Sequence, residues 1–124
     1  MTKSISISRL SNVLVATVQI DLSSEVLDNF RADLLNKVRE HAIKGVLIDL
    51  SEVKTLDRMD MDALLQIVTT VEVMGRGCAF VGIRPGIAMA LVNIGYETEN
   101  LHCARNIDDG LEMIGHLRGI EQCD

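Results

Sequence analysis

Aromatic residues are almost absent from the sequence. Its 124 residues include no tryptophan, one tyrosine and two phenylalanines, although 48% of the residues are hydrophobic. A chain of this length falls within the usual size range of a single domain, and its apolar content is sufficient for a core. That core must therefore consist mainly of aliphatic side chains.

Positive charge is also scarce, because 18 acidic residues outnumber 12 basic ones and give a net charge of −6. Binding to nucleic acid or to an anionic membrane requires a basic face, so this charge argues against both. No apolar stretch approaches the ~18 residues that a membrane-spanning helix needs, and no N-terminal pattern marks a signal peptide. We therefore expect a soluble protein of the cytoplasm.

The residues that most often form metal or catalytic sites are few and scattered. The cysteines fit neither a disulfide framework nor the ligand spacing of a zinc site; they are Cys78, Cys103 and Cys123. The histidines form no HxxxH or HExxH pattern; they are His41, His102 and His116. No nucleophile and base can be paired from the sequence, so we expect neither an enzyme nor a bound cofactor.

Two further patterns have simpler explanations than a ligand site. Asp57, Asp60 and Asp62 could bind a metal, but acidic residues are also favoured in the first turn of a helix. Gly75-Arg-Gly77 resembles part of a nucleotide loop, but it leads from an expected helix into an expected strand, the reverse of the order that cradles phosphate. We therefore expect no metal site and no phosphate loop.

Hydrophobic periodicity predicts alternating strands and helices. Strands are expected at residues 4–10, 13–19, 45–50, 78–81 and 101–103, and the first two should form a hairpin around Ser11-Asn12. Helices are expected after Ser23-Ser24 and at residues 57–74, 86–93 and 107–117. The order ββαβαβαβα predicts one α/β domain, with a mixed, mainly parallel sheet of about five strands and about four helices. We assign the domain to residues 1–117 and expect a frayed tail at residues 118–124.

Two loops are expected at the same edge of this sheet. Ser51–Met59 follows the strand at residues 45–50, and Gly82–Gly86 follows the strand at residues 78–81. Binding sites in open parallel sheets gather at the carboxyl ends of the strands, so both loops are candidate recognition elements. The apolar run Ile87–Val92 is more simply explained as a small buried helix.

An arginine occupies an unusual place at the start of the second long helix. The stretch TLDRMDMDALL, residues 55–65, places three acidic residues around Arg58. Helix N-termini favour negative charge, so an exposed cation there costs up to ~1 kcal/mol. Asp57 is the expected N-cap, and Asp60 or Asp62 is expected to offset the charge of Arg58.

Five segments of the chain carry a family resemblance. They are VLIDLS at residues 46–51, Thr55–Asp57, Gly75–Phe80, GIRPGIAMALVNIG at residues 82–95, and Ala104–Asn106 with Gly110-Leu111. Together they resemble a STAS domain, the fold of anti-anti-sigma factors, between residues 10 and 115. The segment at residues 82–95 is similar to its counterpart in RsbS-type proteins and is the most specific part of the match.

The resemblance implies a non-enzymatic scaffold. RsbS-type proteins co-assemble with larger RsbR-type proteins into the cytoplasmic stressosome, which holds a switch serine/threonine kinase until that kinase phosphorylates the STAS domains. The family has Asp-Ser at the start of this helix, and its serine accepts the phosphate. This sequence has Asp57-Arg58, so the acceptor position falls on Arg58, with Thr55 and Ser51 as alternative acceptors. The implied partner-binding residues are Asp57, Arg58, Met59, Asp60, Gly82, Ile83, Arg84 and Pro85.

Several explanations of Arg58 are compatible with the sequence. They are neutral change with the scaffold role retained, loss of switching at this position, a shift of phosphorylation to Thr55 or Ser51, and an engineered substitution. The function has alternatives too: a direct anti-anti-sigma factor that binds an anti-sigma kinase one to one, or a STAS module that binds a nucleotide or lipid. The scarcity of aromatic residues and the missing phosphate loop argue against the last.

Overall fold

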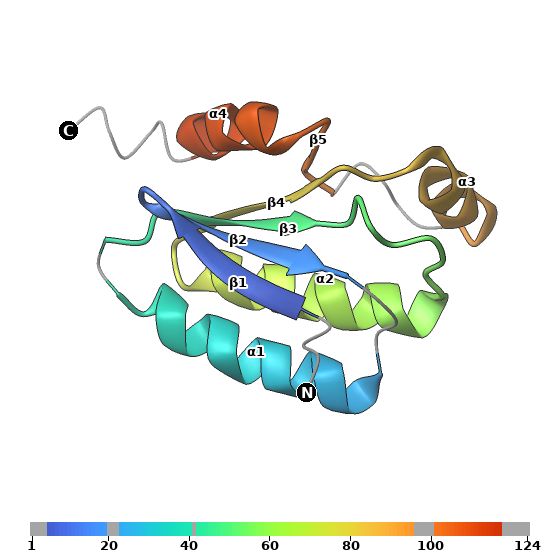
Figure 1. Cartoon of the computed structure of the whole chain (residues 1–124), viewed down its shortest axis with the longest axis horizontal. Helices are drawn as coiled ribbons and strands as arrows, with labels where there is room; N and C mark the ends of the chain where they lie inside the picture. Colours follow the sequence, from blue (N-terminus) through green and yellow to red (C-terminus); the bar gives the residue numbers. More distant parts are fainter. Residues whose placement is uncertain (1–4, 20–22, 41, 96–100, 118–124) are drawn as a thin grey trace.

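Strands and helices alternate along the chain after an initial hairpin (Figure 1). The computed structural model describes residues 5–19, 23–40, 42–95 and 101–117, and within them it contains five strands and four helices. The strands are β1 (Ile5–Leu10), β2 (Val13–Val18), β3 (Gly45–Asp49), β4 (Gly77–Val81) and β5 (Cys103–Ala104). The helices are α1 (Ser24–Val38), α2 (Arg58–Val73), α3 (Pro85–Asn93) and α4 (Ile107–Leu117). The predicted order ββαβαβαβα is confirmed.

The strands form one mixed sheet in the order β1-β2-β3-β4-β5. β1 and β2 are antiparallel, with Leu10 opposite Val13, which confirms the predicted hairpin. β2 to β5 are parallel to one another. The last strand was expected at residues 101–103, but β5 consists of Cys103 and Ala104. These two residues pair with Phe80 and Val81 at the end of β4.

Helices cover both faces of the sheet and one of its ends (Figure 1). α1 and α2 pack side by side on one face, α4 lies over the other, and α3 lies beyond the carboxyl ends of the strands. The larger core, under α1 and α2, is aliphatic apart from Phe30 and Phe80. The smaller core, under α4, includes Leu47, Val81 and Ile114.

Some expectations concern residues beyond those described above. The tail expected at residues 118–124, the position of His41 and the side chain of His116 all lie outside the described residues. Within the described part of the chain, no helix is both long and apolar enough to cross a membrane.

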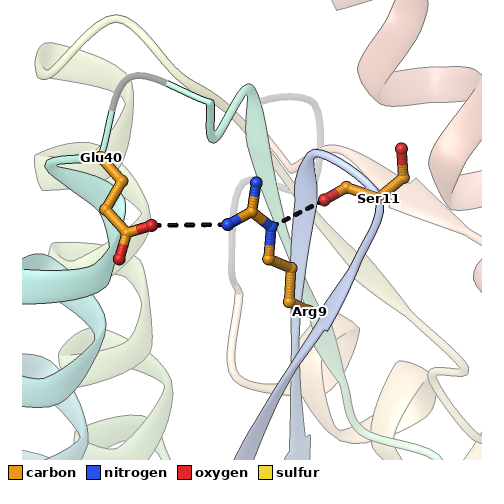
Figure 2. Close-up of polar contacts among 3 residues, drawn as sticks. All are labelled: Arg9, Ser11 and Glu40. Atoms are coloured by element: carbon orange, nitrogen blue, oxygen red, sulfur yellow. Dashed lines mark hydrogen bonds and ion pairs between the residues drawn. The ribbon is translucent and has the colours of Figure 1, made fainter.

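The turn between β1 and β2 lies at the end of the sheet opposite α3 (Figure 1). Figure 2 shows that Arg9 Nε donates to the carbonyl oxygen of Ser11 at 2.9 Å, while Arg9 Nη1 lies 3.4 Å from Glu40 Oε2. Both charged side chains are exposed, so the ion pair contributes no more than about 1 kcal/mol. Ser11 itself has φ 59°, in the left-handed region that non-glycine residues seldom adopt.

Replacing Ser11 with glycine is expected to raise the free energy of unfolding by about 0.5–1 kcal/mol, because glycine adopts this backbone conformation without a steric penalty. The greater freedom of glycine in the unfolded chain offsets part of the gain. Urea denaturation measures the change. Ser11→Val is the control and is expected to destabilise, since a β-branched side chain is strained at positive φ. A Ser11→Gly variant that is less stable than the wild type would contradict this account.

Candidate functional site

Two loops meet at the carboxyl ends of β3 and β4. Leu50 N donates to Val81 O at 3.0 Å, so the chain after β3 stays beside the end of β4. Gly82, the first residue after β4, packs against this loop: a Cβ atom built on it would lie only 2.9 Å from Ser51 Cβ and 3.1 Å from Asp49 Oδ1. The loops that the sequence placed at one edge are therefore in direct contact, although their role in recognition stays a prediction.

Asp57 fixes the start of α2. It has extended backbone angles, φ −94° and ψ 177°, and its Oδ1 accepts a hydrogen bond from Asp60 N at 2.8 Å. This bond satisfies one of the amide groups that have no partner within the first turn of a helix. The expected N-cap is confirmed, and α2 begins at Arg58.

Replacing Asp57 with alanine is expected to lower the free energy of unfolding by about 1 kcal/mol, because the capping bond is lost. Asp57→Asn is the matched control, since the amide oxygen can still accept from Asp60 N and should retain most of the stability. Urea denaturation of the three proteins measures both effects. Equal losses in the two variants would show that the negative charge of Asp57, and not its capping bond, stabilises this helix start.

Arg58 links the start of α2 to the end of α3. Its Nη1 donates to the carbonyl oxygen of Ile94 at 2.7 Å, and Ile94 is the C-cap residue of α3. The carbonyl end of a helix carries partial negative charge, which favours a nearby cation. The guanidinium is therefore unfavourably placed with respect to α2 but favourably placed with respect to α3. We call this contact the Arg58 bridge.

α3 exposes apolar side chains next to the Arg58 bridge. The helix starts at Pro85, and only Ile87 and Leu91 of its side chains are buried. Met89 and Val92 are each 66% exposed, and their spacing of three residues places them on one face. Met59, which follows Arg58 in the chain, is 79% exposed, and Ile94, the other residue of the bridge, is 36% exposed. We call Met59, Met89, Val92 and Ile94 the apolar patch.

The expectation that Ile87–Val92 forms a buried helix is therefore only half correct. The helix exists, but its apolar composition conceals the fact that one side faces solvent. Exposed apolar side chains that share one helix face, as those of Met89 and Val92 do, are more typical of surfaces that bind another molecule than single ones are. The remaining loop residues of this edge that the sequence singled out are half-buried, as for Ile83, or exposed, as for Arg84.

The two alternative acceptor hydroxyls are both accessible. Ser51 and Thr55 are exposed residues of the loop between β3 and α2. The amide of Ser51 donates to Asp49 Oδ1 at 2.9 Å, which fixes the direction of the chain as it leaves β3. A hydroxyl on an exposed loop is open to a kinase, so the geometry leaves both residues available.

A polar pocket of about 410 Å³ adjoins Ser51. Its lining combines the ends of β3 and β4 with the start of α4, and consists of Asp49, Ser51, Val81, Gly82, Arg105, Asn106, Ile107 and Asp108. Asn106 is the N-cap of α4, as its Oδ1 accepts from Asp109 N at 2.8 Å. Asp49 and Arg105 were not among the site residues expected from the sequence. Asp49 is the last residue of β3 and Arg105 directly follows β5, so both lie at the end of a short strand.

Within the described part of the chain, which excludes His41, Cys123 and the side chain of His116, the thiols and histidines form no recognisable catalytic group. Burial, with a smaller effect from Glu72, raises the pKa of the Cys78 thiol well above its ordinary range. Burial also raises the pKa of the Cys103 thiol. His102 Nε2 lies 3.9 Å from Glu72 Oε2. Among the residues that the structure describes, no cluster of three or more His, Cys, Asp or Glu side chains could hold a metal ion.

Comparisons with known proteins agree on one family. The model of the STAS domain family matches residues 4–110. Over 99 residues the chain is 30% identical to the RsbT co-antagonist protein RsbRA of Bacillus subtilis strain 168, which covers 80% of this chain and 35% of RsbRA. The chain thus spans about a third of the length of this curated relative.

Solved structures show the same relationship. A serine-to-glutamate variant of RsbS from Moorella thermoacetica matches with a TM-score of 0.78 and 25% identity, covering 91% of this chain and 96% of RsbS. A chain from the stressosome, described as a signal integration and transduction hub, matches with a TM-score of 0.77 and 25% identity, covering 90% and 97% of the two chains. The range matched by the family model, residues 4–110, includes both loops, α3 and the start of α4.

Proposed function

Because the chain belongs to the STAS domain family and is related to the stressosome proteins RsbRA and RsbS, we propose that it is a non-enzymatic scaffold of a bacterial stress-signalling complex. In this proposal it co-assembles in the cytoplasm with RsbR-like STAS proteins. The assembly holds a switch serine/threonine kinase, and the contact is made by the loops at the carboxyl edge of the sheet.

The Arg58 bridge carries the proposal. It joins the start of α2 to the end of α3 through a bond of 2.7 Å, and the contact of Gly82 with Ser51 joins the loops after β3 and β4. These contacts support a preformed surface in which the apolar patch and the charged side chains of the loops keep fixed positions. A preformed surface loses less conformational entropy on binding than a mobile one, which favours affinity.

Arg58 also determines how this surface can be regulated. Phosphate on a serine at a helix N-terminus adds nearly two negative charges there. Arginine has no hydroxyl to accept that phosphate and supplies a permanent positive charge instead. We infer that contacts at this position are constant, and that any switching by phosphate uses Thr55 or Ser51 in the same exposed loop.

Assembly size tests the scaffold proposal directly. The chain is mixed with an RsbR-like STAS protein and the switch kinase, and the mass of the products is measured by light scattering after size exclusion. We expect a large particle that retains the kinase. A one-to-one complex with an anti-sigma kinase would instead support a direct anti-anti-sigma factor. No binding to any STAS protein would reject the proposal.

Mass spectrometry after incubation with the kinase and ATP tests the regulation. We expect phosphate on Thr55 or Ser51, or no phosphate at all, and an Arg58→Ser variant is expected to gain a site at residue 58. The Thr55→Ala and Ser51→Ala variants assign the modified residue. Phosphate elsewhere in the wild-type chain would contradict the role of this loop.

A further inference from the structure

An apolar pocket of about 370 Å³ lies between α3 and β5. Most of its lining is aliphatic: Ile83, Ala88, Leu91, Val92, Leu101 and Ala104, together with Cys103 and Arg105. Its volume lies within the range of about 300–1,000 Å³ that is usual for small-molecule sites. None of the described residues that line it is aromatic, so these residues offer no flat surface for stacking a base or another planar ring.

Arg105 supplies the positive charge at this pocket. Its side chain is 87% exposed, and its Nε donates to Asp109 Oδ2 at 2.9 Å, which holds the guanidinium beside the start of α4. Among the described residues, no ion pair engages its Nη1 or Nη2. Arg105 also lines the polar pocket next to Ser51, so it lies where the apolar and polar hollows meet. An apolar cavity with one guanidinium at its rim matches a molecule with an apolar body and an anionic head.

We propose that this pocket binds a medium-chain aliphatic carboxylate. The hydrocarbon chain lies among Ile83, Leu91 and Leu101, and the carboxylate accepts hydrogen bonds from the guanidinium of Arg105. A flexible aliphatic chain fits this lining better than a nucleotide, which would need an aromatic or phosphate-binding element. The inference goes beyond the scaffold function and does not depend on it.

The pocket also adjoins the surface proposed to bind partners. Val92 lines the pocket and belongs to the apolar patch, while Leu91 on the same helix is buried. A ligand under α3 would therefore contact the helix that carries the patch and add to the contacts that hold it. Partner binding and ligand binding would then be coupled through α3, with each raising the affinity for the other by the same factor.

Cys103 provides a direct measurement on the isolated chain. Cys103 is exposed and lines the pocket, whereas Cys78 is buried, so alkylation of a Cys123→Ser variant reports on Cys103. Because partial burial of the thiol raises the pKa of Cys103, the reaction is followed at alkaline pH, where more thiolate is present. Decanoate at about ten times its Kd is expected to slow alkylation about tenfold, since only the unoccupied fraction reacts.

Matched variants test separately whether the ligand occupies the pocket and whether its carboxylate contacts Arg105. Ala88→Leu places a larger side chain in the pocket and is expected to abolish protection, whereas Met89→Leu, on the exposed side of the same helix, should retain it. Arg105→Gln is expected to reduce protection by decanoate to the level given by decanol. Circular dichroism checks that each variant is folded. Absence of protection in the wild type, or equal protection by decanol and decanoate, would overturn the proposal.

Discussion

Replacing Arg58 with glutamate is expected to weaken binding to an RsbR-like STAS partner about 30-fold, a loss of about 2 kcal/mol that is typical of a central interface arginine. In the wild type, Arg58 Nη1 donates to Ile94 O at 2.7 Å. Glutamate has a shorter side chain and a carboxylate that only accepts hydrogen bonds, so it cannot donate to the carbonyl oxygen of Ile94. α3 then loses this hydrogen bond to α2, and the apolar patch loses one of the contacts that hold it in place.

The stability of the Arg58→Glu variant is expected to change much less than its binding. The lost hydrogen bond destabilises the fold, but a negative charge in the first turn of α2 is favoured by about 0.3–1 kcal/mol. Urea denaturation should therefore show a change within about 1 kcal/mol, while calorimetry with the partner shows the full loss of affinity. This difference would separate a binding role of Arg58 from a purely structural one.

Two control variants show whether the loss of binding depends on the position of the substitution and on the charge at residue 58. Arg31→Glu makes the same change of charge on an exposed part of α1, where Arg31 pairs with Asp28, and should leave partner binding unchanged. Arg58→Lys keeps the positive charge but replaces the planar guanidinium, and its binding should fall between those of the wild type and the glutamate variant. If Arg58→Glu binds the partner as tightly as the wild type, this edge is not the contact surface.

Local signals explain why much of the fold could be predicted from the sequence. Asp57 and Asn106 cap helices through bonds to amides three residues later, and Pro85 sits at the first position of α3. The turn at Ser11 joins two strands that are close in sequence. Each feature depends on neighbouring residues, so composition and spacing reveal it. The parallel order then places the two loops at one edge.

The contacts that give the candidate site its shape were not predictable in the same way. The Arg58 bridge joins residues 36 positions apart, and no periodic pattern encodes it. From the sequence, the charge of Arg58 was expected to be offset locally by Asp60 or Asp62, and no pattern pointed to a contact with α3. Likewise, the apolar composition of α3 indicated burial, but only the position of α3 beyond the sheet shows that Met89 and Val92 face solvent.

Replacing Gly82 with alanine is expected to lower the free energy of unfolding by about 2–4 kcal/mol, because two separate costs combine. Gly82 has φ 71°, a conformation that disfavours any residue with a Cβ atom. That Cβ would also lie 2.9 Å from Ser51 Cβ, an atom attached directly to the neighbouring backbone. Relief of the contact must move the loop after β3 away from the loop after β4.

Two other glycines separate these costs. Gly75 has φ 88° with no atom within 4 Å of a built Cβ, so Gly75→Ala should lose only the conformational part, about 1–2 kcal/mol. Gly86 lies in α3 with no such neighbour, and Gly86→Ala is expected to stabilise by up to about 1 kcal/mol. Urea denaturation should therefore rank the proteins as Gly86→Ala, wild type, Gly75→Ala and Gly82→Ala, from most to least stable. Equal losses at residues 82 and 75 would show that the loops are not in close contact, and that the two halves of the proposed binding edge move independently.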